Sequence, residues 1–179
     1  MSRQEIRLSG FGGQGIMTAA HILGKAAALF DQRNVTLTKS YGPESRGGAS
    51  SALVIMADED IDYPLLTKLD LLVTMSQEAY TKYIGELSSG GLLIIDRDLV
   101  QLDQPRDDIE VRSIPSTRIA ADELGRKIVA NIVMLGFLAA NTDAISKDGL
   151  KESVLKSIPK GTEKLNISAF ETGYGYGSQ

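Results

Sequence analysis

A glycine cluster near the N-terminus is the first feature with the residue types and spacing for chemistry. Residues 10–15 read Gly-Phe-Gly-Gly-Gln-Gly, and three of these glycines satisfy G-x-G-x-x-G between an expected strand and an expected helix. Glycines let the backbone turn sharply towards a phosphate, and the N-terminus of the next helix supplies unpaired N–H groups and a positive dipole. We therefore expect a cofactor-binding segment made of Gly10, Phe11, Gly12, Gly13, Gln14 and Gly15. A tight turn without a ligand is the alternative.

A nicotinamide or flavin dinucleotide is the first ligand that this motif suggests. The second expected strand ends in Leu37-Thr38-Lys39, where a dinucleotide site usually has an Asp or Glu for the ribose hydroxyls. Asp31 lies before that strand, at the wrong end. The residues thus favour a different anionic ligand, and a stand-alone NAD- or flavin-binding protein is the alternative function.

A second glycine-rich loop, residues 41–48, reads Tyr-Gly-Pro-Glu-Ser-Arg-Gly-Gly. Arg46 is a planar donor suited to a carboxylate or a phosphate, and the glycines beside it let the backbone curl. Because the loop follows the second strand, we expect it at the carboxyl edge of the sheet, facing an anionic group or a partner subunit. Its candidate binding residues are Tyr41, Gly42, Ser45, Arg46, Gly47 and Gly48. The alternative is a solvated turn in which Arg46 pairs with Glu44 or Asp58.

The elements that must position these loops alternate between strands and helices. The patterns predict strands at 5–9, 34–39, 51–56, 70–74, 92–96 and 110–112, and helices at 14–30, 77–87, 116–124, 126–140 and 148–157. Residues 88–91 are expected to form a turn, and Ser116 to cap a helix. The fold class is α/β: a Rossmann-like three-layer sandwich, with a mainly parallel sheet and helices on both faces. A single domain spans 1–179, with 171–179 as a loose C-terminal tail.

Composition excludes several kinds of site. The 179 residues include no cysteine and a single histidine, so thiolate catalysis, cysteine-bound clusters and a Ser-His-Asp triad have little to draw on. We therefore predict no catalytic residues and no metal ligands. The net charge of −4 does not favour nucleic acid or an anionic membrane. The longest apolar run is interrupted and too short to span a bilayer, so a cytoplasmic location is expected.

Four other polar residues have structural interpretations. His21 lies on one helical stripe without a second histidine or a paired acid, which favours an interface or core position. Asn131 stands in an otherwise apolar helix and is expected to tether a loop, because a buried amide must find partners. Asp96 and Asp98 flank Arg97 and are expected to form a surface ion-pair cluster.

Taken in order, the motifs resemble one family. GFGGQG at 10–15 and YGPESRGG at 41–48 resemble the gamma subunit, or gamma domain, of 2-oxoacid:ferredoxin oxidoreductases. The similarity continues over most of the chain through Ile114-Pro115-Ser116-Thr117, Ile119-Ala120, Leu124-Gly125, Asn131, Gly136, Asn166, Ala169-Phe170 and Gly173-Tyr174.

The resemblance implies a non-redox part of a larger enzyme, not catalytic alone. The complete enzyme decarboxylates a 2-oxoacid on thiamine diphosphate, passes electrons through iron–sulfur clusters to ferredoxin, and releases an acyl-CoA. It implies that thiamine diphosphate, Mg²⁺ and the clusters reside in alpha- and beta-type partners, with a ferredoxin-like delta subunit as a further partner. Coenzyme A is the cofactor implied for the two glycine loops. The overall resemblance favours 2-oxoglutarate, with pyruvate, branched-chain and indolepyruvate enzymes as alternatives. Self-association is expected when the chain is isolated.

Overall fold

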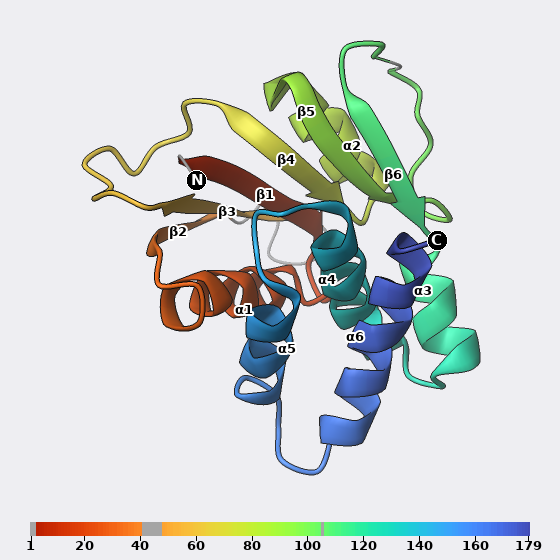
Figure 1. Ribbon diagram of the computed structural model, residues 1–179. Coiled ribbons are helices and arrows are strands. Elements are labelled where there is room, and N and C mark those ends of the chain that lie inside the picture. Colours follow the sequence, from red (N-terminus) through yellow and green to blue (C-terminus); the bar gives the residue numbers. More distant parts are fainter. Residues whose placement is uncertain (1–2, 41–47, 105) are drawn as a thin grey trace.

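A six-stranded β-sheet forms the middle layer of the computed structural model, which describes residues 3–40, 48–104 and 106–179 (Figure 1). The strands run across the sheet in the order β2-β3-β1-β4-β5-β6. β1, β4, β5 and β6 pair in parallel, whereas β3 is antiparallel to both of its neighbours. The expected mainly parallel sheet is confirmed. The strand bounds are β1 (Gln4–Phe11), β2 (Asn34–Ser40), β3 (Ala49–Ala57), β4 (Leu69–Thr74), β5 (Leu87–Asp96) and β6 (Glu110–Ile114).

β3 separates two strands that a simple strand-helix-strand unit would place side by side. β1 and β2 run in the same direction, but β3 lies between them, with Ala49 opposite Phe11 and Ala57 opposite Asn34. The segment between β2 and β3 is too short for the crossover that parallel neighbours need, so the chain returns antiparallel. All nine residues of β3 are buried, as its central position requires.

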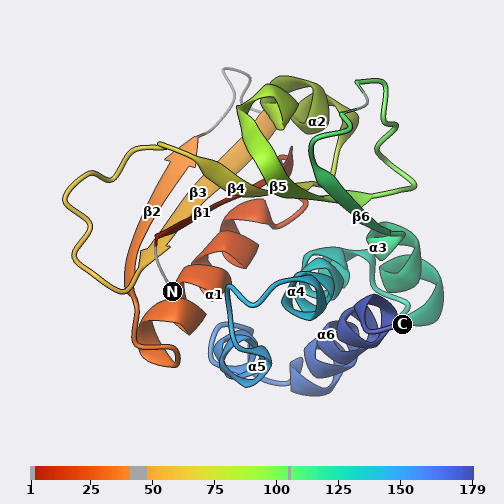
Figure 2. The same cartoon turned by 45° about the horizontal axis from the view of Figure 1, so that its top comes forward.

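Four helices cover one face of the sheet (Figure 2). They are α1 (Ile16–Leu29), α4 (Ala130–Asn141), α5 (Lys147–Leu155) and α6 (Glu163–Gly177), and they share one apolar cluster with the sheet. α4 is the expected central helix, since residues 130–139 are all buried. It begins at Ala130 and not at Arg126, because the 3₁₀ turn η3 (Lys127–Val129) precedes it. None of the described helices is long and apolar enough to cross a membrane.

Two glycines allow α4 and α6 to approach each other closely. A Cβ atom on Gly136 would lie 2.0 Å from the carbonyl oxygen of Phe170, and one on Gly173 would lie 1.9 Å from that of Val133. The C-terminal glycines therefore belong to a packed helix that continues to Gly177. The expectation of a loose tail at 171–179 is wrong, because glycine, unfavourable in an isolated helix, is here required by backbone-to-backbone packing.

The opposite face carries a thinner layer. α2 (Gln77–Tyr83) continues into the 3₁₀ turn η1 (Ile84–Glu86), and its buried Tyr80 and Tyr83 pack on a second apolar cluster. The three-layer sandwich is confirmed, with one short helix on this side (Figure 2). Ser76 begins α2 by accepting a hydrogen bond from the N–H of Ala79 at 3.3 Å.

A charged residue of β1 faces this thinner layer. Because Ile6 packs in the cluster beneath the sheet, its neighbour Glu5 points to the other face. Glu5 is 1% exposed and accepts hydrogen bonds from the N–H groups of Thr67 and Lys68 at 2.7 and 3.0 Å. Burial alone would raise the pKa of Glu5, but the hydrogen bonds from Thr67, Arg3 and Lys68 outweigh it and hold that pKa below its ordinary value.

Two expectations fail around β5. Residues 88–91 do not form a separate turn, because they lie inside the ten-residue strand β5. Ser116 is not a helix cap, because Pro115 occupies the cap position and the Ser116 hydroxyl donates to Asp96 instead. The expected helix 116–124 is divided into a single turn, α3 (Ser116–Arg118), and a π-helical turn, η2 (Ile119–Glu123).

Candidate functional site

The first glycine loop lies at the carboxyl end of the two central parallel strands. It leads from β1 into α1, and the neighbouring strand β4 leads through Met75 and Ser76 into α2. α1 packs in the cluster on one face of the sheet and α2 in the cluster on the other. Connections that leave neighbouring strands to opposite faces open a crevice between them, and ligands of α/β proteins commonly bind there.

Gln14 fastens the glycine loop to the end of β4. Its side-chain oxygen accepts a hydrogen bond from the N–H of Phe11 at 2.7 Å, and its Nε2 donates to the carbonyl oxygen of Met75 at 2.8 Å. Gly10 gives this side chain its room, because a Cβ on Gly10 would lie 2.4 Å from the Gln14 oxygen. The hydrogen bonds of the Gln14 amide and the lack of a side chain at Gly10 thus determine the conformation of the loop.

Gly13 and Gly15 have backbone conformations that favour glycine, with φ angles of 100° and 74°. Gly15 begins α1 without a side-chain cap, and it is held by Asn131, whose Nδ2 donates to the Gly15 carbonyl at 3.1 Å. Asn131 is therefore the loop tether that its place in an apolar helix predicts. It links the glycine loop to the buried helix α4.

Gly12 differs from the other glycines of the loop. Its φ lies outside the left-handed region, and a Cβ at this position would meet no atom of the described residues within 4 Å. The described part of the fold therefore does not require glycine here. The first turn of α1 contains no acidic side chain, and its leading N–H groups have no acceptor within the helix. Such a surface is suited to the close approach of an anionic group.

The second glycine loop is described only at its ends. Of its candidate residues, Tyr41, Gly42, Ser45, Arg46 and Gly47 lie outside the described residues. Gly48 is half-buried and directly precedes β3. The side chain of Ser50 donates to the carbonyl oxygen of Gly10 at 3.3 Å, so the described end of the second loop lies beside the first loop. This position agrees with the expected common edge.

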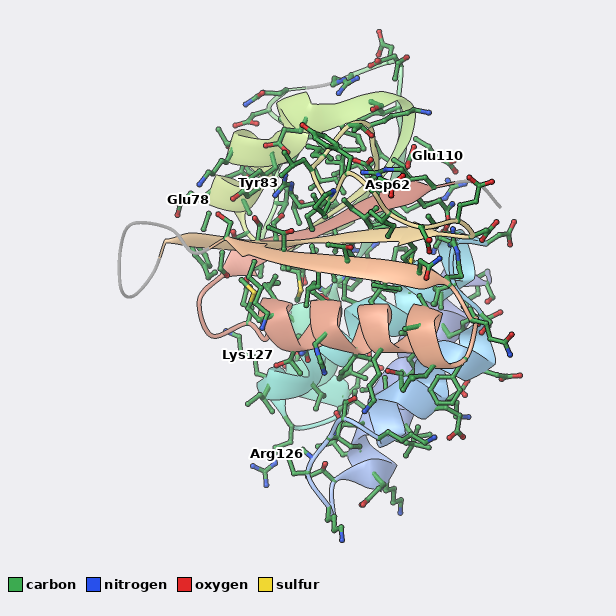
Figure 3. All side chains as sticks on the ribbon, turned by 90° about the vertical axis from the view of Figure 1, so that its left-hand side faces the viewer. Asp62, Glu78, Tyr83, Glu110, Arg126 and Lys127 are labelled. Carbon is green, nitrogen blue, oxygen red and sulfur yellow. The ribbon has the colours of Figure 1, made fainter. Side chains whose placement is uncertain are left out.

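A cationic side chain completes this edge. A cavity of about 260 Å³ is lined by Gly13, Gln14, Met75, Thr117, Lys127, Ile128 and Ala130. Lys127 lies beside the end of α1 that carries the glycine loop (Figure 3), and no residue in the described part of the chain pairs with it. The sequence pattern did not single out Lys127. Its only signal is a basic pair, Arg126-Lys127, that follows Gly125 and precedes an apolar helix.

Asp96 positions another residue of that cavity. It is fully buried and accepts hydrogen bonds from the Ser116 hydroxyl at 2.6 Å and the N–H of Thr117 at 2.8 Å. The expected surface cluster of Asp96 and Asp98 is therefore wrong for Asp96. Only Asp98 is at the surface, where it pairs with Arg118 at 3.2 Å. Asp96 holds the start of α3 against the end of β5 and so fixes Thr117 at the cavity.

The single histidine takes no part in this site. His21 is exposed on α1, which contradicts a core position. Among the described residues, no group of three or more His, Cys, Asp or Glu side chains is arranged to hold a metal ion. The chemistry that the edge can perform is the binding of an anionic group by backbone N–H groups and a lysine.

Comparison with known proteins gives the family. Residues 5–176 match the family described as pyruvate ferredoxin/flavodoxin oxidoreductase. The 2-oxoglutarate synthase subunit KorC of Methanocaldococcus jannaschii is 52% identical over 173 residues, which cover 96% of this chain and 92% of the relative. The gamma subunit of a keto/oxoacid ferredoxin oxidoreductase from Geobacter sulfurreducens is 39% identical with a TM-score of 0.89, covering 98% of this chain and 96% of that one.

A third comparison supports the fold alone. The 2-oxoglutarate:ferredoxin oxidoreductase of Magnetococcus marinus, solved with 2-oxoglutarate, coenzyme A and succinyl-CoA bound, is 23% identical with a TM-score of 0.88. The match covers 99% of this chain and 31% of that longer one. The ordered motifs, the crevice between β1 and β4 and the near full-length matches agree: this chain belongs to the pyruvate ferredoxin/flavodoxin oxidoreductase family, as a gamma-type member.

Proposed function

We propose that this chain is the gamma subunit of a 2-oxoglutarate:ferredoxin oxidoreductase. The complex converts 2-oxoglutarate and coenzyme A to succinyl-CoA and carbon dioxide and passes the electrons to ferredoxin. The observation that carries the proposal is the 52% identity to a KorC subunit over nearly the whole of both chains. The choice of 2-oxoglutarate over pyruvate or a branched-chain 2-oxoacid rests on that identity.

The redox chemistry belongs to other subunits in this proposal. The chain contains no cysteine, so it cannot supply the thiolates that hold iron–sulfur clusters. Alpha- and beta-type subunits provide the clusters, thiamine diphosphate and Mg²⁺, and a ferredoxin-like delta subunit is a further partner. Two exposed apolar side chains favour a partner contact at this edge: Phe11 of the glycine loop, at 40%, and Ile128 beside it, at 78%. Self-association of the isolated chain and a cytoplasmic location stay predictions.

The role of this chain is to hold coenzyme A at the glycine-loop edge. Coenzyme A carries phosphate groups, and it takes up the acyl group as a thioester. The open space at Gly12, the uncapped start of α1 and the nearby Lys127 fit an anionic phosphate. Arg46 lies outside the described residues, and the sequence predicts its loop at the same edge, where we propose that it acts as a second cation.

The alternative of a stand-alone dinucleotide-binding protein has a geometric weakness. In such proteins the acid that binds the ribose follows the strand beside β1. Here β3 occupies that place, and β2 is displaced by one further strand spacing, about 4.8 Å. The alternative predicts that the isolated chain binds NAD or a flavin, which equilibrium dialysis measures directly.

The test of the proposed role is the apparent affinity of the assembled complex for coenzyme A. Lys127→Ala removes a cation from the edge, and Arg46→Ala removes the cation that the sequence predicts there. We expect each variant to raise the KM for coenzyme A about 10-fold while the KM for 2-oxoglutarate is unchanged. Lys68→Ala is the matched control, because Lys68 is exposed and precedes β4 at the opposite edge of the sheet. Unchanged coenzyme A affinity in both edge variants would refute the role.

A further inference from the structure

The β3–β4 loop, residues 58–68, projects beyond the sheet in both ribbon views (Figure 1, Figure 2). It carries two large apolar side chains in solvent, since Tyr63 is 57% exposed and Leu65 is 54% exposed. Pro64 stands between them and fixes the backbone φ angle at that position. Large apolar side chains that are grouped on the surface, unlike scattered ones, indicate an interaction site.

This loop is fixed to the fold by polar contacts at its base. The buried carboxylate of Glu5 accepts a hydrogen bond from the N–H of Thr67 at 2.7 Å, and Arg3 donates through Nη2 to the carbonyl oxygen of Leu65 at 2.8 Å. Two apolar side chains of the loop pack against the second apolar cluster: Ile61 and Leu66. A loop held in this way loses little further conformational entropy when a partner covers it.

Negative charge borders the exposed apolar side chains. Residues 58–66 include no basic residue and four acids: Asp58, Glu59, Asp60 and Asp62. Asp58 pairs with Arg33 at 3.2 Å. Glu59 and Asp62 are exposed and form no ion pair with a described residue, and Asp62 directly precedes Tyr63. These two carboxylates are therefore available to basic groups of a partner.

The charge of the loop decides which kind of partner fits. A two-fold contact between copies of this chain would bring the same acids face to face, and like charges across an interface are unfavourable. An anionic membrane or a nucleic acid would be repelled for the same reason. A different protein, with an apolar depression surrounded by basic side chains, is complementary to the apolar side chains and to the acids beside them.

We propose that the β3–β4 loop docks on such a protein, with Tyr63 and Leu65 in the depression and Glu59 and Asp62 facing basic side chains on its rim. The assignment of that protein as another subunit of the oxidoreductase rests on the proposed function. β3 begins beside the glycine loop and ends at the β3–β4 loop, and its nine residues separate the two by about 27 Å. The docking surface is therefore separate from the contact at the glycine-loop edge.

Photo-crosslinking in the purified complex identifies the partner. The photoreactive residue p-benzoylphenylalanine in place of Tyr63 keeps an aromatic ring in the loop, and mass spectrometry after irradiation identifies the peptide that it joins. We expect this peptide to belong to a larger subunit and to contain lysine or arginine close to the joined residue. The same probe in place of Leu102 is the matched control, because Leu102 is 45% exposed in the connection from β5 to β6, and it should not join that peptide.

Two substitutions separate the apolar contact from the charges, with association measured by size-exclusion chromatography of the complex on dilution. Leu65→Ser should weaken the association of this chain with the larger subunits about 10-fold at any ionic strength. Asp62→Lys should weaken it about 5-fold at low ionic strength and much less at about 0.5 M salt, because salt screens exposed charges. Leu102→Ser is the control and should associate like the wild type. All three positions are exposed, so the isolated chain should keep its melting temperature.

The outcomes distinguish this inference from the proposed function. If the complex turns over 2-oxoglutarate and Leu65→Ser associates as tightly as the wild type, the docking surface is wrong and the proposed function stands. Crosslinks only between copies of this chain, or association of Asp62→Lys that is unchanged at low salt, would likewise overturn the docking proposal alone. If the wild-type chain assembles with no larger subunit, both are wrong. A crosslink to a larger subunit, together with a salt-dependent loss in Asp62→Lys, supports the proposal.

Discussion

Substitution of Gly173 by alanine tests how α6 is held against the buried helix α4. A methyl group at this position would lie 1.9 Å from the carbonyl oxygen of Val133 and 3.1 Å from the backbone nitrogen of Phe137. These are backbone atoms, so no side-chain rotation relieves the overlap, and the two helices must separate by more than an ångström. Overpacking of a well-packed core costs about 1–3 kcal/mol, and the rigid neighbours place this variant near about 3 kcal/mol.

Gly175→Ala is the matched control in the same helix. Gly175 is exposed, and a Cβ there meets no described atom within 4 Å. Alanine is favoured over glycine in a helix by about 0.5–1 kcal/mol, so this variant should be slightly more stable than the wild type. The same chemical change thus has opposite predicted signs at two positions of one helix.

Differential scanning calorimetry of the two variants measures this contrast. For a chain of this size, 1 kcal/mol shifts the melting temperature by about 2–4 °C. Gly173→Ala should therefore lower it by about 6–12 °C, and Gly175→Ala should raise it by about 1–4 °C. Equal melting temperatures for Gly173→Ala and the wild type would show that α4 and α6 are not packed through their glycines.

Three further substitutions test the site and its supports. Asp96→Asn places an amide NH₂ where donors now converge, so we expect a loss of about 2 kcal/mol, measured by urea unfolding. Glu5→Gln should lower the stability of the fold at neutral pH and make that stability less dependent on acid. Hydrogen bonds from Thr67 and its neighbours depress the pKa of Glu5, so the ionised carboxylate stabilises the fold above the ordinary pKa of 4.5. This stabilisation is lost as the pH falls through the lower pKa of the folded state. Gly12→Val should leave the melting temperature unchanged and weaken coenzyme A binding, measured by calorimetry of the complex, because no described residue lies within 4 Å of a Cβ at this position and the side chain would enter the proposed ligand site.

Each of these expectations has an opposing result. If Asp96→Asn were as stable as the wild type, the hydrogen bonds from Ser116 and Thr117 would not depend on a carboxylate at this position. An acid unfolding curve of Glu5→Gln parallel to that of the wild type would exclude Glu5 as a source of acid sensitivity. A large fall in melting temperature for Gly12→Val would show that the fold itself requires glycine at this position.

Periodicity and punctuation in the sequence were sufficient to predict most elements and the first glycine loop. Strand β1, helix α1 and the buried α4 follow from runs of apolar residues with helical or strand spacing, which depend on near neighbours in the chain. The tether from Asn131 could also be inferred, because an amide in an apolar helix has few explanations.

The remaining features depend on contacts between distant segments. β3 lies between β1 and β2 because of strand pairing across the sheet, and local sequence patterns do not predict which strands pair. In the sequence the glycines of α6 suggest a loose tail, whereas in the structure they allow close packing against the carbonyl groups of α4. Asp96 resembles a surface acid until Ser116, twenty residues later, is packed beside it. Lys127 becomes a candidate binding residue only in the folded chain, where the starts of α1 and α4 lie at the same edge of the sheet.

The most direct test of the central claim is purification of the affinity-tagged chain from its native cells under anaerobic conditions, followed by an assay of the purified material. We predict that larger subunits with iron–sulfur absorbance accompany the chain, and that the material forms succinyl-CoA from 2-oxoglutarate and coenzyme A while reducing ferredoxin. A chain that is isolated alone, or a complex that does not turn over any 2-oxoacid with coenzyme A, would contradict the account.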